Sequence, residues 1–421
     1  MRKFGRKLTS SLLALALLVS LLPIGAAPAQ ADTAGAFTVT KNEGSSDNAY
    51  TYSNGVLTVN DGAKLTISTN SQISDRIVIS DNANVELTLA GVTIVAPYGE
   101  LSDADSAIDV GDGAILSITL QAESSNTITG GSSQNNLAGP GIHVPDSASL
   151  VIQGSGGLSV TGGNSSSSYG GNGIGGKPVS GQAGGASGTV IILATGGITI
   201  SGGAGMGTGS GVDIGGDQGS PDGDNGQGIR PDTNGTYTVY GDLKLPCDIT
   251  IPQGAAVTIP EGNSLTVPEN VTLTNNDNIT GEGSLKGDGT VTNNGDISVS
   301  DNDFMATVEV NVSTSPAAYN SSVTLTANVT NGDSSVSDGT VTFYRGKVND
   351  SNKLNDEPAN VTSGTATTSI QLTGNGWTPR ESPYTITAVY TPAAGSSLIE
   401  SSGSTQLTVT KAEQSAPNGT F

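Results

Sequence analysis

Histidine, cysteine and tryptophan each occur once in the chain of 421 residues, and aromatic residues make up 4% of it. A zinc site built from His and Cys needs three or four such ligands, and a disulfide needs two cysteines, so both are excluded. A Ser-His-Asp or Cys-His hydrolase needs a histidine base. The single His143 stands between Ile142 and Val144, with its side chain expected to point outward. We interpret it as a plain surface residue.

Basic residues are also few, with 16 Lys and Arg against 38 Asp and Glu and a formal net charge of −22. All four charges in residues 1–31 are positive, so the rest of the chain carries 12 minus 38, or −26. A polyanion repels phosphate groups, which argues against nucleic acid as a partner. The same charge attracts cations.

The shortage of basic residues argues against an enzyme. A polysaccharide lyase needs Lys or Arg beside its acids to stabilise the enolate, and a glycoside hydrolase needs a pair of carboxylates. Between positions 42 and 300 the basic residues are scattered along the chain: Lys64, Arg76, Lys177, Arg230, Lys244 and Lys286. We expect no catalytic residues, while a β-helix lyase or hydrolase stays an alternative.

Residues 1–31 have the composition of a secretory signal peptide. A positive segment at 2–7 precedes an apolar stretch at 11–24, and Ala-Gln-Ala at 29–31 supplies the small-x-small pattern that signal peptidase reads. We expect cleavage before Asp32, export to the extracellular space or cell surface, and no membrane insertion after cleavage. An uncleaved anchor is the alternative, but the apolar stretch is short for a span of about 20 residues.

A repeat of two alternating aliphatic pairs around a turn residue recurs between positions 57 and 273. Its copies are Leu57, Val59, Asp61, Ala63, Leu65, Ile67; Ile77, Ile79, Asp81, Ala83, Val85, Leu87; Ile108, Val110, Asp112, Ala114, Leu116, Ile118; Ile142, Val144, Asp146, Ala148, Leu150, Ile152; Ile249, Ile251, Gln253, Ala255, Val257, Ile259; and a weaker Leu265, Val267, Glu269, Val271, Leu273. The period of two predicts strand, tight bend and strand, and such units bury their apolar faces only by stacking.

The fold class that follows is all-β, with a right-handed parallel β-helix over residues 32–302. A sandwich is the runner-up for this region. The Asp that recurs at the bend suggests either a ladder of ligands or only an Asx-turn. Residues 154–230 are Gly-rich, and within them we expect 164–173 and 175–188 to be long mobile loops that project from the helix.

From about residue 303 to 411 the pattern changes to alternating strands separated by turn signals, which predicts an immunoglobulin-like sandwich without a disulfide. We expect Tyr344, Trp377, Tyr384 and Tyr390 to form its bulky core, although Trp377 could instead stack on a sugar. Residues 412–421 read as a linker or truncated tail, as in a fragment of a longer protein.

Three segments of this region resemble the bacterial Ig-like domain repeat of Gram-positive surface proteins. They are Gly-Thr-Val-Thr-Phe-Tyr at 339–344, Gly-Thr-Ala-Thr at 364–367 and Tyr-Thr-Ile-Thr-Ala-Val-Tyr-Thr-Pro at 384–392. The resemblance implies a spacer or adhesive module that has no active site.

The N-terminal part is similar to secreted carbohydrate-binding parallel β-helix proteins of Firmicutes. The similarity rests on Ala-Ile-Asp-Val-Gly-Asp-Gly-Ala at 107–114 and on coils that close with Gly-Gly. Some of those proteins bind acidic sugars with calcium, so the resemblance implies a polysaccharide or cell-wall glycan as the partner.

Acidic side chains gather in two places that suit calcium, which prefers oxygen ligands. The candidate metal ligands are Glu100, Asp103, Asp105 and Asp109 in one group, and Asp213, Asp217, Asp222 and Asp224 in the other. Neither group matches an EF-hand or the nonapeptide calcium repeat, and solvated acidic loops are the alternative. Calcium is the only cofactor that the sequence suggests.

These features predict an exported, non-catalytic, monomeric module that binds an acidic polysaccharide through calcium and is presented on an Ig-like spacer. Few aromatic residues are available to stack on neutral sugars, which favours acidic glycans bridged by a cation. A purely structural stalk or adhesin segment is the second hypothesis, and a β-helix polysaccharide lyase or hydrolase is the third.

Overall fold

The computed structural model describes residues 31–99, 103–178, 187–205, 212–214, 227–232, 236–332, 334–374, 376–379, 383–393, 396 and 398–412. These residues form β-strands and one short 3-10 helix, Asp350–Asn352, so the prediction of an all-β chain is confirmed. Within the described ranges no helix has the length and apolar character needed to cross a membrane. The chain divides into two compact units, residues 1–188 with 196–225, and residues 189–195 with 226–421.

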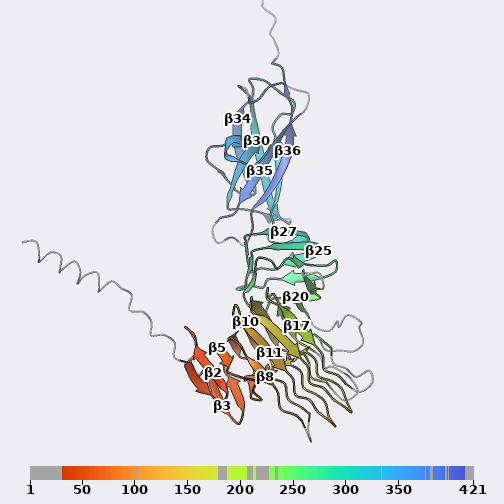
Figure 1. Cartoon of the computed structure of the whole chain (residues 1–421). Coiled ribbons are helices and arrows are strands. Elements are labelled where there is room, and N and C mark those ends of the chain that lie inside the picture. Colours follow the sequence, from red (N-terminus) through yellow and green to blue (C-terminus); the bar gives the residue numbers. More distant parts are fainter. Residues whose placement is uncertain are drawn as a thin grey trace, which may run out of the picture. The chain divides into compact units, whose positions relative to one another are not determined.

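The strands of the first unit form three sheets, and the chain visits each sheet in turn (Figure 1). The β9 sheet contains β3 (Tyr50–Ser53), β4 (Val56–Val59), β6 (Arg76–Ile79), β9 (Ile108–Asp109), β12 (Ile142–His143) and β15 (Ile174–Gly175). The β10 sheet contains β1 (Ala31–Ala34), β2 (Phe37–Lys41), β5 (Lys64–Thr69), β7 (Asn84–Leu89), β10 (Ile115–Leu120) and β13 (Ser149–Gly154). The β11 sheet contains β8 (Thr93–Val95), β11 (Ser125–Thr129), β14 (Gly157–Thr161) and β17 (Ile198–Ser201).

Equivalent residues of successive repeats lie side by side in parallel strands, as the repeat pattern predicts. In the β9 sheet, Leu57 pairs with Ile77, Ile77 with Ile108, and Ile108 with Ile142. In the β10 sheet Leu116 likewise lies beside Val85 and Leu150, but Leu65 lies beside Leu87 and not beside its equivalent Val85, so the first copy is shifted there by two residues. All of these side chains are buried, with at most 1% of their surface exposed. Each repeat therefore completes the apolar core of its neighbours.

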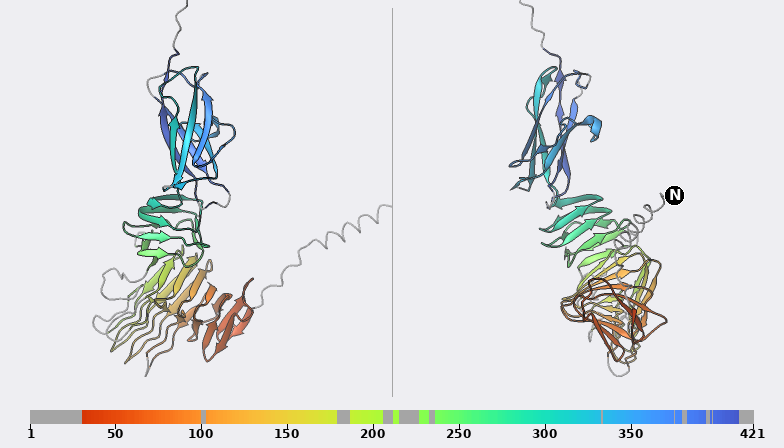
Figure 2. Two further views of the ribbon diagram at one scale, coloured as in Figure 1. Left: turned by 180° about the vertical axis from the view of Figure 1, so that it is seen from behind. Right: turned by 90° about the vertical axis from the view of Figure 1, so that its left-hand side faces the viewer.

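Between the β11 sheet and the β9 sheet the chain makes extended excursions that stack on one another (Figure 2). Equivalent excursions include residues 97–99 with 103–105, residues 131–139 and residues 163–171, and Ser133 pairs in parallel with both Gly99 and Ser165. A chain of backbone hydrogen bonds, which we call the glycine ladder, joins the two legs of the second and third excursions, through Gly139 N to Gly131 O and Gly171 N to Gly163 O. The ladder also links these excursions to each other through Gly163 N to Gly139 O, and to the following segment through Gly203 N to Gly171 O, with all four bonds 2.8–2.9 Å long.

The segment at 164–173 is a projecting loop, as expected from the sequence, and it stacks on equivalent loops (Figure 2). Its backbone is hydrogen-bonded to neighbouring excursions, and Ser165 and Asn172 are buried. The lack of side chains along the glycine ladder permits this approach, because a Cβ atom on Gly163 would overlap the carbonyl group of Gly131. Of the second expected loop, residues 179–186 lie outside the described residues.

The second unit continues with short stacked strands. One set contains β16 (Thr189–Ile192), β18 (Gly228–Pro231), β19 (Tyr237–Tyr240), β20 (Asp242–Lys244), β22 (Val257–Thr258), β23 (Ser264–Thr266), β25 (Asn278–Lys286) and β27 (Asp296–Asn302). Another contains β21 (Ile249–Ile251), β24 (Thr272–Asn275) and β26 (Thr290–Asn293). Pairing is parallel except between β18 and β19. Ile249 lies beside Leu273 and not beside Leu265, its equivalent in the sequence repeat, so the last two copies stack in a register that the sequence pattern does not predict.

The remaining strands of this unit are mostly antiparallel. One sheet contains β28 (Thr307–Val312), β30 (Ser322–Asn331), β31 (Ser334–Ser335) and β34 (Thr365–Gln371), and a second contains β33 (Ala359–Asn360), β32 (Thr340–Arg345), β35 (Tyr384–Thr391) and β36 (Ser401–Leu407). A short parallel pair joins β29 (Ala317–Ala318) to β37 (Val409–Thr410). One hydrophobic core cluster lies within residues 306–409.

Three of the four bulky residues that the sequence indicates, Trp377, Tyr384 and Tyr390, belong to this core cluster, whereas Tyr344 is buried outside the cluster and its neighbour Phe343 lies within it. Tyr390 is fully buried, and Tyr344, Trp377 and Tyr384 are at most 8% exposed. The Trp377 ring meets the Tyr384 ring edge to face at 5.0 Å, and the Arg345 guanidinium lies 5.2 Å from the centre of the indole. Trp377 is therefore a core residue, and its ring is not presented to a sugar.

Candidate functional site

The candidate site lies on the outer surface of the β9 sheet, where two short strands place an acid beside a histidine. Ile108 and Ile142 point into the core and are fully buried, so the next residues, Asp109 and His143, point outward. The parallel register puts His143 directly beside Asp109 on one side and beside Gly175 on the other.

Both carboxylate oxygens of Asp109 have partners. Oδ1 lies 2.6 Å from Nδ1 of His143, and Oδ2 accepts a hydrogen bond of 2.9 Å from Nζ of Lys177, which follows β15. The side chains of His143 and Asp109 are 16% and 21% exposed, whereas that of Lys177 is 43% exposed. The lysine ammonium is therefore the part of this group that is most open to a ligand.

The protonation of Asp109 follows from these contacts. Burial raises the pKa of its carboxyl, but the His143 hydrogen bond and the Lys177 charge outweigh burial and lower that pKa to about 2. An ionised carboxylate only accepts hydrogen bonds, so Nδ1 of His143 carries the proton that it donates to Asp109. Nε2 is then the imidazole nitrogen that is left to contact a ligand.

A pH titration of stability tests this assignment. Because the folded-state pKa of Asp109 lies below its ordinary value of 3.8, ionised Asp109 stabilises the fold above that value, and the contribution is lost as the pH falls through about 2. We expect Asp109→Asn to lower the melting temperature at neutral pH, and the difference from the wild type to shrink between about pH 4 and about pH 2. A difference that stays constant over this range would show that the Asp109 ion pairs do not form.

A second ion pair belongs to the same region. Nη1 of Arg76, on β6, lies 2.9 Å from Oδ1 of Asp105 and also donates to the carbonyl oxygen of Ser106 at 3.3 Å. The Arg76 side chain is mostly buried, at 14% exposure, whereas that of Asp105 is 53% exposed. We use the name ionic cluster for these five residues: Arg76, Asp105, Asp109, His143 and Lys177.

The ionic cluster corrects two interpretations made from the sequence. His143 is not a plain surface residue, because its ring is largely buried and bonded to Asp109. The basic residues are not all scattered in space, because Arg76 and Lys177 each pair with an acid of the same predicted group. Aligning Ile108 with Ile142 in the repeat would have predicted the contact between Asp109 and His143. No comparable pattern points to Lys177.

The candidate calcium ligands are placed as follows. Asp105 and Asp109 belong to the ionic cluster, and Oδ1 of Asp103 instead accepts the backbone N–H of Leu137 at 3.2 Å. In the second group, Oδ1 of Asp213 accepts the N–H of Gly202 at 3.0 Å. The other predicted ligands lie outside the described residues: Glu100, Asp217, Asp222 and Asp224. Among the residues that the structure does describe, no three His, Cys, Asp or Glu side chains are grouped as metal ligands.

The chemistry of the ionic cluster is that of recognition through charge. Calcium could reach Asp109 only by competing with His143 and Lys177, because these groups bind both of its carboxylate oxygens, whereas at Asp105 the contact to Arg76 involves Oδ1 and the side chain is 53% exposed. A ligand carboxylate, in contrast, could share the exposed Lys177 ammonium without breaking its pair with Asp109.

Comparison with known protein families, with curated proteins and with solved structures returned no match.

Proposed function

We propose that this chain is an exported, non-catalytic module that binds an acidic polysaccharide on the outer face of the β9 sheet. In this proposal residues 32–302 form a right-handed parallel β-helix, and residues 303–411 form an Ig-like spacer of the kind found in Gram-positive surface proteins. The chain acts as a monomer in the extracellular space or at the cell surface. We expect no nucleic-acid partner and no membrane insertion after signal cleavage.

The observation that carries the proposal is that the half-exposed Lys177 ammonium and the more buried side chains of His143 and Arg76 lie at the outer side of one sheet, in a chain whose charge beyond residue 31 is −26. A uronate is repelled by most of this protein, and this surface offers an ammonium and an imidazole nitrogen that suit its carboxylate and hydroxyl groups. Asp105 holds the Arg76 guanidinium and Asp109 holds the Lys177 ammonium in a fixed position, which limits the conformational entropy that these side chains lose when a ligand binds.

Calcium has a secondary place in this proposal. The Asp105 carboxylate of the ionic cluster is 53% exposed, and the mature chain repels a bare polyanion, so a bridging cation would strengthen binding. We therefore expect binding that is strengthened by calcium and that also depends on Lys177. Changing both Asp105 and Asp109 to Asn is expected to weaken binding further, because the cations lose the groups that position them.

A glycan array tests the function directly. The mature chain is applied with calcium and again with a chelator, and we expect binding to uronate-containing polysaccharides rather than to neutral ones. Lys177→Gln should weaken binding by at least about tenfold, since a hydrogen bond to a charged group contributes roughly 1.5–3 kcal/mol. Lys244→Gln, at an exposed residue of β20, makes the same change of charge elsewhere and serves as the matched control.

The outcomes separate the competing hypotheses. Binding that is abolished by chelator and unaffected by Lys177→Gln would favour a calcium bridge over the ionic cluster. Binding that is unaffected by both treatments would contradict the proposed site. An array without any bound glycan in the presence of calcium would favour a structural stalk.

The ionic cluster also favours one second candidate, a polysaccharide lyase. β-Elimination needs a base for the proton next to the uronate carboxylate and a cation that neutralises the enolate, and His143 Nε2 and Lys177 Nζ lie on either side of Asp109. The test is the ultraviolet absorbance of an unsaturated uronide during incubation of the mature chain with each bound polysaccharide. Absorbance that rises in the wild type and not in His143→Gln would establish the lyase.

A further inference from the structure

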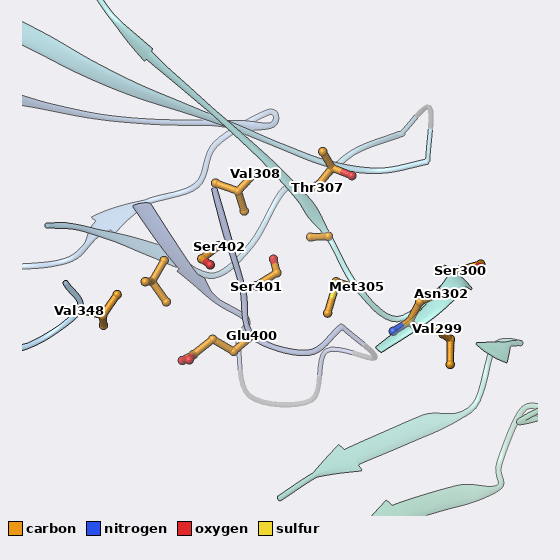
Figure 3. Close-up of a pocket in the computed structure, with 12 residues that line it drawn as sticks. Val299, Ser300, Asn302, Met305, Thr307, Val308, Val348, Glu400, Ser401 and Ser402 are labelled. Atoms are coloured by element: carbon orange, nitrogen blue, oxygen red, sulfur yellow. The ribbon is translucent and has the colours of Figure 1, made fainter. Parts of the chain in front are cut away.

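The second unit contains a cavity of about 750 Å³ that plays no part in the proposed glycan site (Figure 3). β27 contributes Val299, Ser300 and Asn302 to its lining, and β36 contributes Ser401 and Ser402. The remaining lining residues are Met305, Ala306, Thr307, Val308, Val348, Val389 and Glu400. Its volume lies in the usual range for ligand-binding pockets, roughly 300–1,000 Å³.

A buried hydroxyl group in this cavity lacks a partner. Ser401 is 8% exposed, and its Oγ makes no hydrogen bond with any described group. Figure 3 shows the Ser401 side chain between those of Ser402 and Met305. Leaving a buried hydroxyl unpaired costs free energy, so a ligand that donates or accepts a hydrogen bond here removes that cost.

The exposed part of the cavity lining combines two large apolar side chains with polar ones. Met305 is 39% exposed and Val348 is 54% exposed, and both are among the few large hydrophobic residues that the described chain leaves open to solvent. Glu400 is the only charged residue of the lining, and it is exposed. The cavity therefore suits a ligand that combines an aliphatic group with a positive charge.

One wall of the cavity is the edge of a sheet. β27 pairs in parallel with β25, and no other described strand pairs with it. A strand with one neighbour presents a row of backbone N–H and C=O groups on its open side, which are ready to bind another extended chain. The open edge favours a peptide over a small molecule as the ligand, because an extended peptide can form hydrogen bonds with the whole row of backbone groups.

We propose that this cavity binds an extended peptide segment of a partner protein that adds to the free edge of β27. Main-chain hydrogen bonds to β27 align the segment, and an aliphatic side chain contacts Met305 and Val348. A neighbouring lysine or arginine of the segment pairs with Glu400, and a polar group reaches Ser401. The Ig-like region thereby contributes to an attachment site for another exported protein, separately from the glycan surface.

The experiment uses the mature chain and the capped peptide Thr-Val-Lys-Val-Thr, with binding followed by calorimetry and by hydrogen exchange. We expect binding together with slower exchange of the β27 amides. Replacing the central lysine of the peptide by glutamate should weaken binding roughly tenfold, and Glu400→Gln should remove that preference. A peptide with proline in place of both valines should not bind, because proline lacks the N–H that pairing needs.

Two variants keep the proposal open to refutation. Val348→Asp changes an exposed residue, so it should leave the melting temperature unchanged and weaken peptide binding at least about tenfold. Thr367→Asp adds the same charge at an exposed residue of β34 outside the cavity and should bind like the wild type. Absence of binding by the wild type, equal binding by Val348→Asp, or a dimer in gel filtration that Val348→Asp abolishes would each overturn the proposal, the last in favour of a second copy of this chain.

Discussion

Replacing Ile118 by aspartate is expected to remove the cooperative unfolding of the first unit or to destabilise it by several kcal/mol. Ile118 is fully buried and lies between Leu87 and Ile152 in the β10 sheet, so a carboxylate at this position would face aliphatic groups alone. Because each stacked repeat completes the core of its neighbours, the damage extends to the strands on either side. Thermal unfolding of the mature chain, followed by circular dichroism, measures the effect.

The adjacent residue provides the matched control. Thr119 is on the same strand and is exposed, so Thr119→Asp adds the same charge to the same backbone without burying it. We expect a change within about 0.5 kcal/mol for this variant. Equal melting temperatures for the two variants would contradict the stacked arrangement of the repeats.

Replacing Gly163 by alanine is expected to have the second-largest effect, although it adds only one methyl group. The added Cβ atom would overlap backbone atoms of Gly131, which cannot rotate away as a flexible side chain would. The excursions would have to separate, with loss of the hydrogen bond between Gly163 N and Gly139 O. We expect a loss of at least about 1–3 kcal/mol in the free energy of unfolding, measured by urea titration.

Gly197 is the control for this substitution, because a Cβ atom built there meets no atom within 4 Å and its φ is not positive. Gly197→Ala should change stability by less than about 0.5 kcal/mol. If Gly163→Ala is as stable as Gly197→Ala, the excursions are not held together by the glycine ladder in solution.

The aliphatic columns could be predicted from the sequence because their signal is carried by side chains. Alternation at Leu57 and Val59, or at Ile108 and Val110, identifies which residues point inward, and all four are buried. Equivalent positions of successive repeats then have to lie side by side, and Leu57 beside Ile77 is one example. The same alignment could have predicted that Asp109 lies beside His143, because each of them follows one of the paired residues Ile108 and Ile142.

The excursions could not be predicted in this way. Their contacts join backbone groups, so Gly, Ser and Asn, the residues typical of free loops, are also the residues that permit the stacking. Buried amides give the same ambiguity. Asn126 is 1% exposed because its side chain accepts the N–H groups of Gly91 and Val92 and donates to the carbonyl of Gly157, yet asparagine in a sequence ordinarily indicates a turn.

Lys177 illustrates a third limit. It reaches Asp109 over 68 positions of sequence from a segment rich in glycine, where the period of two is interrupted. The register of β15 against β12 places Gly175 beside His143, and this position depends on the length of the preceding excursion. A charged side chain that follows such a strand has no apolar pattern of its own, so its partner cannot be inferred from the sequence.

The stacked excursions also constrain how the gene can change length. The excursions at 131–139 and 163–171 are equal in length, and an insertion in one of them would leave backbone groups of its neighbours without partners. The corner that follows the β10 sheet is different, because four residues separate β10 from β11, at 121–124, and only two separate β13 from β14, at 155–156. Small insertions and deletions should therefore accumulate at that corner, whereas the excursions should be gained or lost only as parts of whole coils.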